Sequence, residues 1–213
     1  MIKKWGIDID GVLADFESAM QPLVVNVSGK SRFTVPLHLR TQESISGFLR
    51  SLGYSKADID AAWAMEHRDE FWQDIEPLQP NMIAFNRVLH NTLVPRGDEI
   101  YFVTARRGIK DSTELWLTDH TGVYNPTVLL TPDKGTVARG LALDVFVDDR
   151  LEQALAVRLE SIATRVYLLD KPYNAYNAID GITRVKSLSE VFAAEEDIDL
   201  ANAATQDPLD VLE

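Results

Sequence analysis

The chain contains no cysteine among its 213 residues. Disulfide bonds, thiolate metal ligands and a cysteine nucleophile are therefore excluded, and the absence is typical of a reducing compartment. No apolar run approaches the roughly 20 residues that span a bilayer, and charged residues recur by Asp8, before the apolar core of a signal peptide could form. We therefore expect a cytoplasmic protein with no membrane partner.

Basic residues are also in short supply, with 21 Lys and Arg against 33 Asp and Glu, which gives a net charge of −12. A surface this acidic disfavours extended binding to a nucleic-acid backbone. Much of the acidic excess lies in residues 193–213, which we expect to form a mobile acidic tail without a catalytic role. The four histidines show no metal-ligand spacing, so no histidine metal site is expected: His38, His67, His90 and His120.

Short apolar runs alternate with helical patterns along most of the chain. Strands are expected at residues 4–9, 99–103, 127–130, 144–147 and 165–169, and helices at 81–92, 110–121, 134–142 and 151–160. Nearly continuous apolar strands belong to parallel sheets that are covered on both faces. The pattern predicts a doubly wound α/β domain, and such sheets bind ligands at the carboxyl ends of their strands.

The connection between the first two expected strands is far longer than an ordinary crossover of about a dozen residues. It carries helical patterns of its own at Glu43–Leu52 and from Ser55 onward. We therefore predict a small helical cap over residues 17–78, inserted after the first strand. The α/β core would then comprise residues 1–16 and 79–192.

Two carboxylates separated by one residue, Asp8 and Asp10, follow the first apolar run, with Gly11 next. Residues i and i+2 of a strand face the same side, so both acids converge where a buried strand gives way to a loop. Uncompensated carboxylates this close raise each other's pKa, and a hard cation such as Mg²⁺ stabilises them together. The two acids predict a metal-assisted phosphoryl-transfer site. Without other motif residues, two acids with this spacing are more often part of a turn.

Other candidate residues stand just after later strands: Thr104 after the second, Asp133 and Lys134 after the third, and Asp148 and Asp149 after the fourth. Alone, Thr104 would cap a helix and Lys134 would be a solvated charge. Together at one sheet edge, these residues supply a carboxylate nucleophile, a hydroxyl, an ammonium group and a metal-binding acid pair. That inventory is typical of phosphoryl transfer through an aspartyl-phosphate.

The four segments in this order resemble the haloacid dehalogenase (HAD) superfamily of phosphatases, whose fold is Rossmann-like. Within it, the chain is similar to the 5'(3')-deoxyribonucleotidase family. Three segments carry that similarity: Asp8-Ile9-Asp10-Gly11-Val12-Leu13-Ala14-Asp15-Phe16-Glu17, Ile75-Glu76-Pro77-Leu78 and Leu169-Asp170-Lys171-Pro172-Tyr173-Asn174.

The resemblance implies a role for each motif residue. The catalytic residues would be Asp8, Asp10, Thr104 and Lys134, and the Mg²⁺ ligands would be Asp8, Asp10, Asp149 and Asp148. Asp8 would attack phosphorus, and Asp10 would protonate the leaving oxygen and then activate water. Thr104 would bind the phosphoryl group and Lys134 would neutralise its charge.

Substrate contacts are expected from residues beside these motifs: Phe16, Ala105, Arg106, Phe71 and Trp72. Phe16 matches an aromatic residue that contacts the nucleoside in the relatives, whereas aromatic residues of a cap more often form its core. Ala105-Arg106-Arg107 departs from the deoxyribonucleotidase pattern, which has a serine and no arginines there. Arginine at this place can grip a phosphate or a second anionic group bidentately.

The predicted function is a Mg²⁺-dependent phosphomonoesterase acting on a nucleoside monophosphate. Alternatives are a phosphatase for another small phosphate ester or for nucleic-acid ends, a receiver-like signalling protein, and a non-catalytic protein that binds a phosphate ligand. The motif order disfavours a receiver. In a receiver the acid pair comes first and the phosphorylated Asp stands alone on a later strand, whereas here Asp8 and Asp10 come first and the pair Asp148 and Asp149 comes last. The sequence leaves the base, the sugar, the position of the phosphate and the oligomeric state open, with a homodimer as one candidate.

Overall fold

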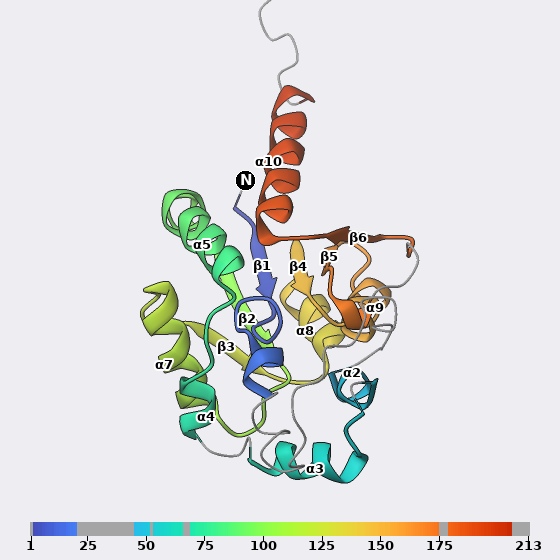
Figure 1. Cartoon of the computed structure of the whole chain (residues 1–213). Coiled ribbons are helices and arrows are strands. Elements are labelled where there is room, and N and C mark those ends of the chain that lie inside the picture. Colours follow the sequence, from blue (N-terminus) through green and yellow to red (C-terminus); the bar gives the residue numbers. More distant parts are fainter. Residues whose placement is uncertain (1, 21–44, 52, 66–68, 175–178, 206–213) are drawn as a thin grey trace, which may run out of the picture.

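A six-stranded parallel sheet forms the centre of the computed structural model, which describes residues 2–20, 45–51, 53–65, 69–174 and 179–205. The strand order is β3-β2-β1-β4-β5-β6, so the first strand lies where the winding reverses direction (Figure 1). The strands are β1 (Lys4–Ile7), β2 (Glu99–Thr104), β3 (Thr127–Leu130), β4 (Val145–Asp148), β5 (Arg165–Leu169) and β6 (Ile182–Val185). The predicted doubly wound α/β fold is confirmed, with β6 as an additional edge strand.

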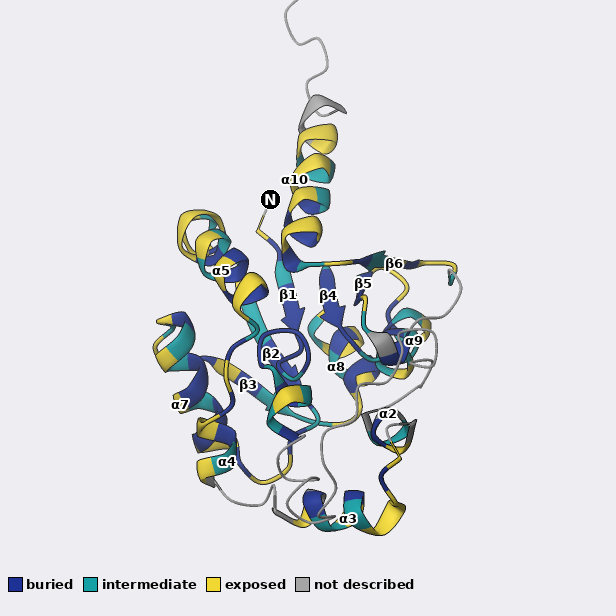
Figure 2. Ribbon diagram, in the orientation of Figure 1, coloured by how far each residue is buried: buried dark blue, intermediate teal, exposed yellow. Residues whose placement is uncertain are grey.

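Helices cover both faces of the sheet, as the alternating burial of β4 illustrates. Val145 and Val147 belong to one apolar cluster, whereas Phe146 between them belongs to the other. The first cluster is covered by α5 (Gln79–Val88), which continues through a π-helical turn η2 (Leu89–Leu93) into α6 (Val94–Arg96), and by α7 (Lys110–Thr121) and α10 (Leu188–Thr205). The second is covered by α8 (Lys134–Leu141) and α9 (Leu151–Glu160). Figure 2 shows the buried residues concentrated on the strands and on the inward sides of these helices.

Three short helices lie beyond the carboxyl ends of the strands, within the segment predicted to form a cap (Figure 1). They are α2 (Ile45–Ser51), α3 (Lys56–Met65) and α4 (Asp69–Gln73). The first two match the helical patterns at 43–52 and from residue 55 onward. Residues 21–44 of the predicted cap lie outside the described residues, as do the side chains of Phe48 and Trp63. The division into core and cap therefore stays a prediction.

The segment predicted as a mobile acidic tail needs a correction at its start. Residues 193–205 continue helix α10, and Glu195 is buried. Its carboxylate contacts Lys3 Nζ at 2.8 Å and forms a two-pronged ion pair with Arg165 at 2.6 and 2.7 Å. A buried acidic residue with two cationic partners, one of them buried, docks the helix on the sheet, which a count of charges along the sequence does not reveal. Residues 206–213 lie outside the described residues.

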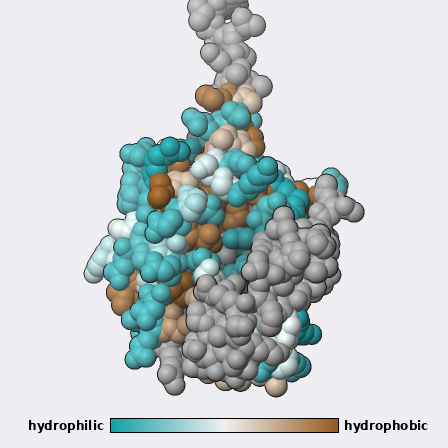
Figure 3. All heavy atoms as spheres, in the orientation of Figure 1, coloured by the Kyte–Doolittle hydropathy of each residue, from teal (hydrophilic) through white to brown (hydrophobic). Residues whose placement is uncertain are grey.

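The described surface is mixed in character. Figure 3 shows hydrophilic residues over much of the face in view, with smaller apolar areas between them. Among the helices described here, none has the length and apolar content needed to cross a membrane.

Candidate active site

The loop after β1 holds Asp8 and Asp10 in a tight turn. The carbonyl of Ile9 accepts backbone hydrogen bonds from Leu13 at 2.8 Å and from Ala14 at 2.9 Å, which folds the chain back directly after the first acid. Gly11 has φ +80° and a Cβ at this position would collide with the carboxylate of Asp149. The turn therefore requires glycine, both for its left-handed backbone and for the close approach of the second acid motif.

Lys134 joins two of the acids. It begins helix α8, where Asp133 accepts a hydrogen bond from Thr136 N and caps the helix. Its Nζ lies 2.8 Å from Asp8 Oδ1 and 2.6 Å from Asp148 Oδ2, and the residue is only 1% exposed. Burial opposes the charged ammonium, but the two carboxylates raise the pKa of Lys134 above its ordinary value, so it stays protonated. The alternative of a solvated surface lysine is thereby excluded.

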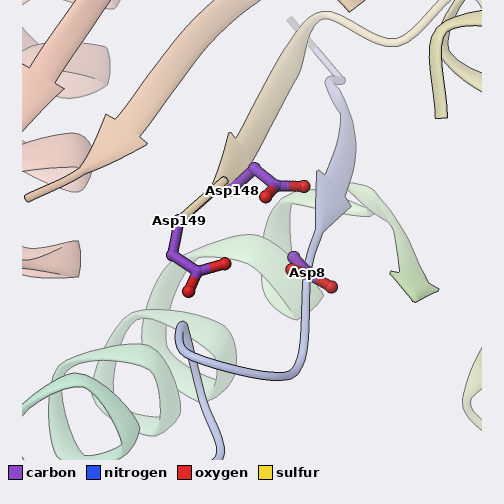
Figure 4. Close-up of side chains that lie close together, drawn as sticks. All are labelled: Asp8, Asp148 and Asp149. Atoms are coloured by element: carbon purple, nitrogen blue, oxygen red, sulfur yellow. The ribbon is translucent and has the colours of Figure 1, made fainter. Parts of the chain in front are cut away.

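Three buried carboxylates, Asp8, Asp148 and Asp149, converge beside this lysine. Each offers one oxygen such that all three lie within 4.8 Å of one another, and Figure 4 shows them approaching from the ends of β1 and β4. Burial raises the pKa of Asp149 to about 7, with the charge of Asp148 adding to the effect. Burial also raises the pKa of Asp8 well above its usual value, although Lys134 opposes this shift. One lysine does not compensate three carboxylates.

The donor set fits a hard divalent cation. Oδ1 of Asp149 is buried and accepts no hydrogen bond, which is costly for a carboxylate oxygen unless a cation binds it. Asp148, in contrast, uses Oδ2 for Lys134 and Oδ1 for the backbone N–H of Arg150 at 2.8 Å. An all-oxygen set of this kind suits Mg²⁺. Asp149 is the better-placed ligand of the pair, and Asp148 is engaged in orienting Lys134.

The late Pro-Tyr-Asn segment supports Asp149 from behind. Tyr173 donates its hydroxyl to Asp149 Oδ2, and Asn174 Nδ2 donates to the Asp149 carbonyl at 2.6 Å and to the Leu169 carbonyl at 2.7 Å. Burial raises the pKa of Tyr173 well above its ordinary value, so its hydroxyl stays protonated and remains a donor. This segment fixes the orientation of the free Oδ1 atom of Asp149.

We expect Tyr173→Phe to weaken metal binding, because it releases Oδ2 of Asp149 and lets the carboxylate rotate. The dissociation constant of Mg²⁺, measured by isothermal titration calorimetry, should rise ~10–100-fold, the usual cost of losing such a supporting hydrogen bond. Tyr101→Phe removes a hydroxyl that bonds Glu99 on β2 and serves as the matched control. An unchanged Mg²⁺ affinity in Tyr173→Phe would show that the tyrosine does not orient Asp149.

Thr104 is the last residue of β2, Arg106 follows two residues later, and both face the loop after β1. Thr104 is fully buried, and its hydroxyl lies 3.5 Å from Asp10 Oδ2. It does not cap the next helix, because α7 begins only at Lys110 after Ile109. Arg106 is also buried and reaches Asp10 with two nitrogens, Nε at 2.9 Å and Nη2 at 2.7 Å.

A cavity of about 670 Å³ opens over these residues. The predicted site residues that line it are Asp8, Asp10, Phe16, Trp72, Thr104, Ala105, Arg106, Lys134 and Asp149. Asp148 lies directly beneath, bound to Lys134. The cavity has the size of an ordinary small-molecule site.

An aromatic group closes one side of this cavity. The ring of Phe16 stacks on Trp72 with a centroid distance of 5.5 Å and an interplanar angle of 14°. Phe71 meets both rings edge-on at 6.1 and 5.1 Å but does not line the cavity. Phe71 therefore supports the two rings that form the wall.

Other lining residues were not assigned from sequence: Asp60 and Ala64 of α3, Pro132, Arg150 and Gln153. Arg150 directly follows the acid pair, so its place at the end of β4 was a usable signal. Asp60 and Ala64 carry no motif, because a cap helix meets the cavity only through tertiary packing.

The chain matches one family model, described as 5' nucleotidase, deoxy (pyrimidine), cytosolic type C protein (NT5C), over residues 1–198. No curated protein matches it closely enough to count as a relative.

Among solved structures, the chain is similar to a haloacid dehalogenase-like hydrolase from Streptococcus pneumoniae, with 14% identity, a TM-score of 0.57 and coverage of 91% of this chain and 98% of the other. It is also similar to a HAD family hydrolase from Deinococcus radiodurans that holds phosphate and sodium, with 15% identity, a TM-score of 0.59 and coverage of 93% and 97%. A putative phosphoglycolate phosphatase from Lactobacillus plantarum shares 16% identity at a TM-score of 0.52, with coverage of 91% and 99%. These structures share the fold of this chain.

Proposed function

Since the chain belongs to the cytosolic type C 5'-deoxynucleotidase family and is a phosphatase with the HAD fold, we propose that it hydrolyses nucleoside monophosphates with Mg²⁺ through an aspartyl-phosphate. One observation carries the proposal: Asp8, Lys134 and Asp149 meet at the floor of a cavity that Asp10 also lines. The cytosolic type in the family's description supports our expectation of a cytoplasmic enzyme.

Asp8 is the nucleophile in the proposed reaction. Lys134 and the backbone N–H of Ile9 both contact Oδ1 at 2.8 Å, and we assign the attack to Oδ2, which takes part in neither contact. A bond forms between Oδ2 and phosphorus while the bond from phosphorus to the ester oxygen breaks. The charge on Lys134 favours the anionic phosphoryl group at this point.

Asp10 moves the protons. It gives a proton to the departing ester oxygen, which leaves as an alcohol. It then takes a proton from water as the water oxygen bonds to phosphorus and the bond to Asp8 breaks, which releases phosphate and restores Asp8. Asp8, the Asp10 carbonyl and Asp149 would hold a Mg²⁺ ion, which would supply charge neutralisation for the phosphoryl oxygens. Thr104 lies beside Asp10 and is assigned to hold the phosphoryl group.

The aromatic wall supports a nucleoside as the group attached to the phosphate. Phe16 and Trp72 line the cavity near the acids and present aromatic ring atoms beside the charged side chains. A base has a π-face that stacks on such rings, whereas a sugar phosphate lacks one. Arg107 and Arg150 also line the cavity, so a 3'-phosphorylated oligonucleotide belongs in the substrate test beside the mononucleotides.

A panel of phosphomonoesters assayed for phosphate release tests this proposal. We expect higher kcat/KM for 5'- and 3'-deoxynucleoside monophosphates than for sugar phosphates or p-nitrophenyl phosphate. Phe16→Leu keeps most of the buried volume and removes the stacking ring. It should lower kcat/KM for nucleotides ~5–150-fold, in line with ~1–3 kcal/mol for one stacked base.

Hydrolysis of p-nitrophenyl phosphate by Phe16→Leu should change little, because the phosphate-handling residues lie on the sheet. Equal slowing of all substrates would assign Phe16 a structural role. A wild-type preference for a sugar phosphate or an oligonucleotide end would contradict the mononucleotide assignment and leave the phosphatase chemistry in place.

A further inference from the structure

Arg106 is buried at 5% exposure, and it binds an acid that lines the active-site cavity. Its Nε donates to Asp10 Oδ2 at 2.9 Å and its Nη2 donates to Asp10 Oδ1 at 2.7 Å. The two parallel contacts engage both oxygens of the carboxylate. This fork geometry fixes the plane of the carboxylate as well as its position, which a single hydrogen bond does not do.

The guanidinium is itself held from three sides. Nη1 donates to Thr113 Oγ1 on α7 at 3.3 Å. The Cζ atom lies 4.5 Å from the centroid of the Trp72 ring on α4 and 5.9 Å from that of Trp116 on α7. A cation over an aromatic face is attracted by the ring quadrupole, and more so where water is excluded. Arg106 is therefore a fixed group that has no freedom to follow Asp10.

Trp116 is anchored in turn. Its indole N–H donates to the Ile75 carbonyl at 2.7 Å, in the segment where the chain re-enters the core after α4. Trp72, which covers the guanidinium from the other side, stacks on Phe16. The support of Arg106 thus comes from one core helix and from the predicted cap, whereas its charge is directed at Asp10.

The sequence pattern suggested that an arginine here grips a substrate phosphate. In the structure each of the three guanidinium nitrogens already contacts a protein oxygen, two on Asp10 and one on Thr113. These contacts occupy three of the five N–H groups, so Arg106 would have to release Asp10 in order to grip a phosphate with the same Nε and Nη2 fork. A bidentate contact leaves one further lone pair on each carboxylate oxygen, so Asp10 can exchange a proton with an ester oxygen or a water while Arg106 holds it.

We infer that Arg106 is a positioning residue that orients Asp10 for proton transfer and does not bind the substrate phosphate. The inference rests on the proposed function, in which Asp10 is the general acid and base. Asp10 is 19% exposed at its side chain and lies in the turn after β1, outside any helix or strand, so other rotamers are open to it without the fork. Displacement of a catalytic group by about 1 Å can cost ~10²-fold in rate.

The first test separates kcat from KM. We expect Arg106→Met to lower kcat for a deoxynucleoside monophosphate ~10²-fold, while KM and the inhibition constant of inorganic phosphate stay within ~3-fold of wild type. Arg106→Lys keeps the charge but loses the fork, so it should fall close to Arg106→Met. It also carries the test if Arg106→Met does not fold. Arg139→Met, at an exposed arginine of α8, is the matched control and should behave as the wild type.

The second test asks whether Arg106 acts through Asp10. Asp10→Asn should lower kcat ~10²–10⁴-fold, as expected for loss of the general acid and base. Adding Arg106→Met to Asp10→Asn should change the residual rate by less than ~2-fold, since the group that Arg106 positions is already lost. A phosphate-binding arginine would instead cost its full factor again in the double variant.

Several results would overturn the inference. They are a rise in KM and in the phosphate inhibition constant with kcat unchanged, a full additional loss in the double variant, and wild-type kinetics in Arg106→Met. If Asp10→Asn alone turned over like the wild type, the proposed acid–base role would fail and this inference with it. Loss of activity in Asp10→Asn beside wild-type kinetics in Arg106→Met would overturn the inference alone.

Discussion

Asp8→Asn is expected to lower kcat by ~10⁴-fold or more, because removal of a covalent nucleophile costs at least that order. The amide has nearly the same shape as the carboxylate but is a poor nucleophile. The fold should not suffer. Burial raises the pKa of Asp8 well above its usual value, so the charged carboxylate is disfavoured in the folded protein, and a neutral side chain beside Lys134 and Asp148 relieves that cost. The melting temperature of metal-free Asp8→Asn should therefore equal or exceed that of the wild type.

Phosphate release measured under saturating Mg²⁺ and substrate tests this expectation, and acid quench with peptide mass spectrometry locates the phosphoryl group on Asp8 of the wild type. Asp119→Asn removes one charge from an exposed position of α7 and should keep wild-type activity. An Asp8→Asn variant that turned over at a wild-type rate would eliminate the aspartyl-phosphate mechanism. A phosphorylated residue other than Asp8 would assign the nucleophile elsewhere.

Removal of divalent metal is expected to have the second large effect. Exhaustive chelation should abolish phosphate release, and Mg²⁺ should restore it, because Asp8 and Asp149 otherwise repel the substrate phosphate as well as each other. At a Mg²⁺ concentration of about 100 times the dissociation constant, binding should stabilise the fold by ~2.7 kcal/mol. For a chain of this size that corresponds to a rise in melting temperature of roughly 5–10 °C. Full activity after chelation would exclude a metal role.

The stabilisation of the fold by Mg²⁺ should also depend on pH, and the protonation of Asp149 determines whether it grows or shrinks as the pH rises. Burial, together with the neighbouring Asp148, raises the pKa of this carboxyl to about 7 in the folded protein. An acid whose pKa is higher in the folded protein stabilises the fold at a pH below its pKa in the unfolded chain, which is about 4. That stabilisation is lost as the pH rises through the pKa of the folded state, about 7. Mg²⁺ replaces the proton. The increase in melting temperature on adding Mg²⁺ should therefore be larger at about pH 8 than at about pH 5.5, and equal shifts at both values would contradict a ligand role for Asp149.

The convergence of Asp8, Lys134 and Asp149 at the cavity floor could be predicted from sequence because parallel strands end at one edge of a sheet. Apolar runs located β1, β2 and β4, and the acids and the threonine that follow them therefore fall together. Motif order then distinguished the pair that is proposed to supply the nucleophile from the later acid pair. Sequence also indicated the helices α2 and α3, through apolar residues at helical spacing.

The support around that floor was beyond sequence reasoning, since it depends on partners far apart in the chain. Arg106 contacts three residues from different elements: Asp10 in the loop after β1, Trp72 on α4 and Thr113 on α7. No local pattern in the sequence links these positions. The edge strand β6 has only four residues with two of them buried, so its alternation was too short to recognise. Charge counting likewise misplaced the start of the acidic tail, because Glu195 is neutralised by residues remote in sequence.

The ion pairs of Lys3 with Glu195 and Asp199 have a practical consequence for handling the protein. They tie residue 3 to the middle of α10, so that both ends of the described chain emerge at the amino edge of the sheet (Figure 1), whereas the cavity lies at its carboxyl edge. An affinity tag, a fluorophore or a surface tether attached at either of these ends leaves the cavity facing the solution. Immobilised or fused forms of the enzyme should therefore remain accessible to their substrates.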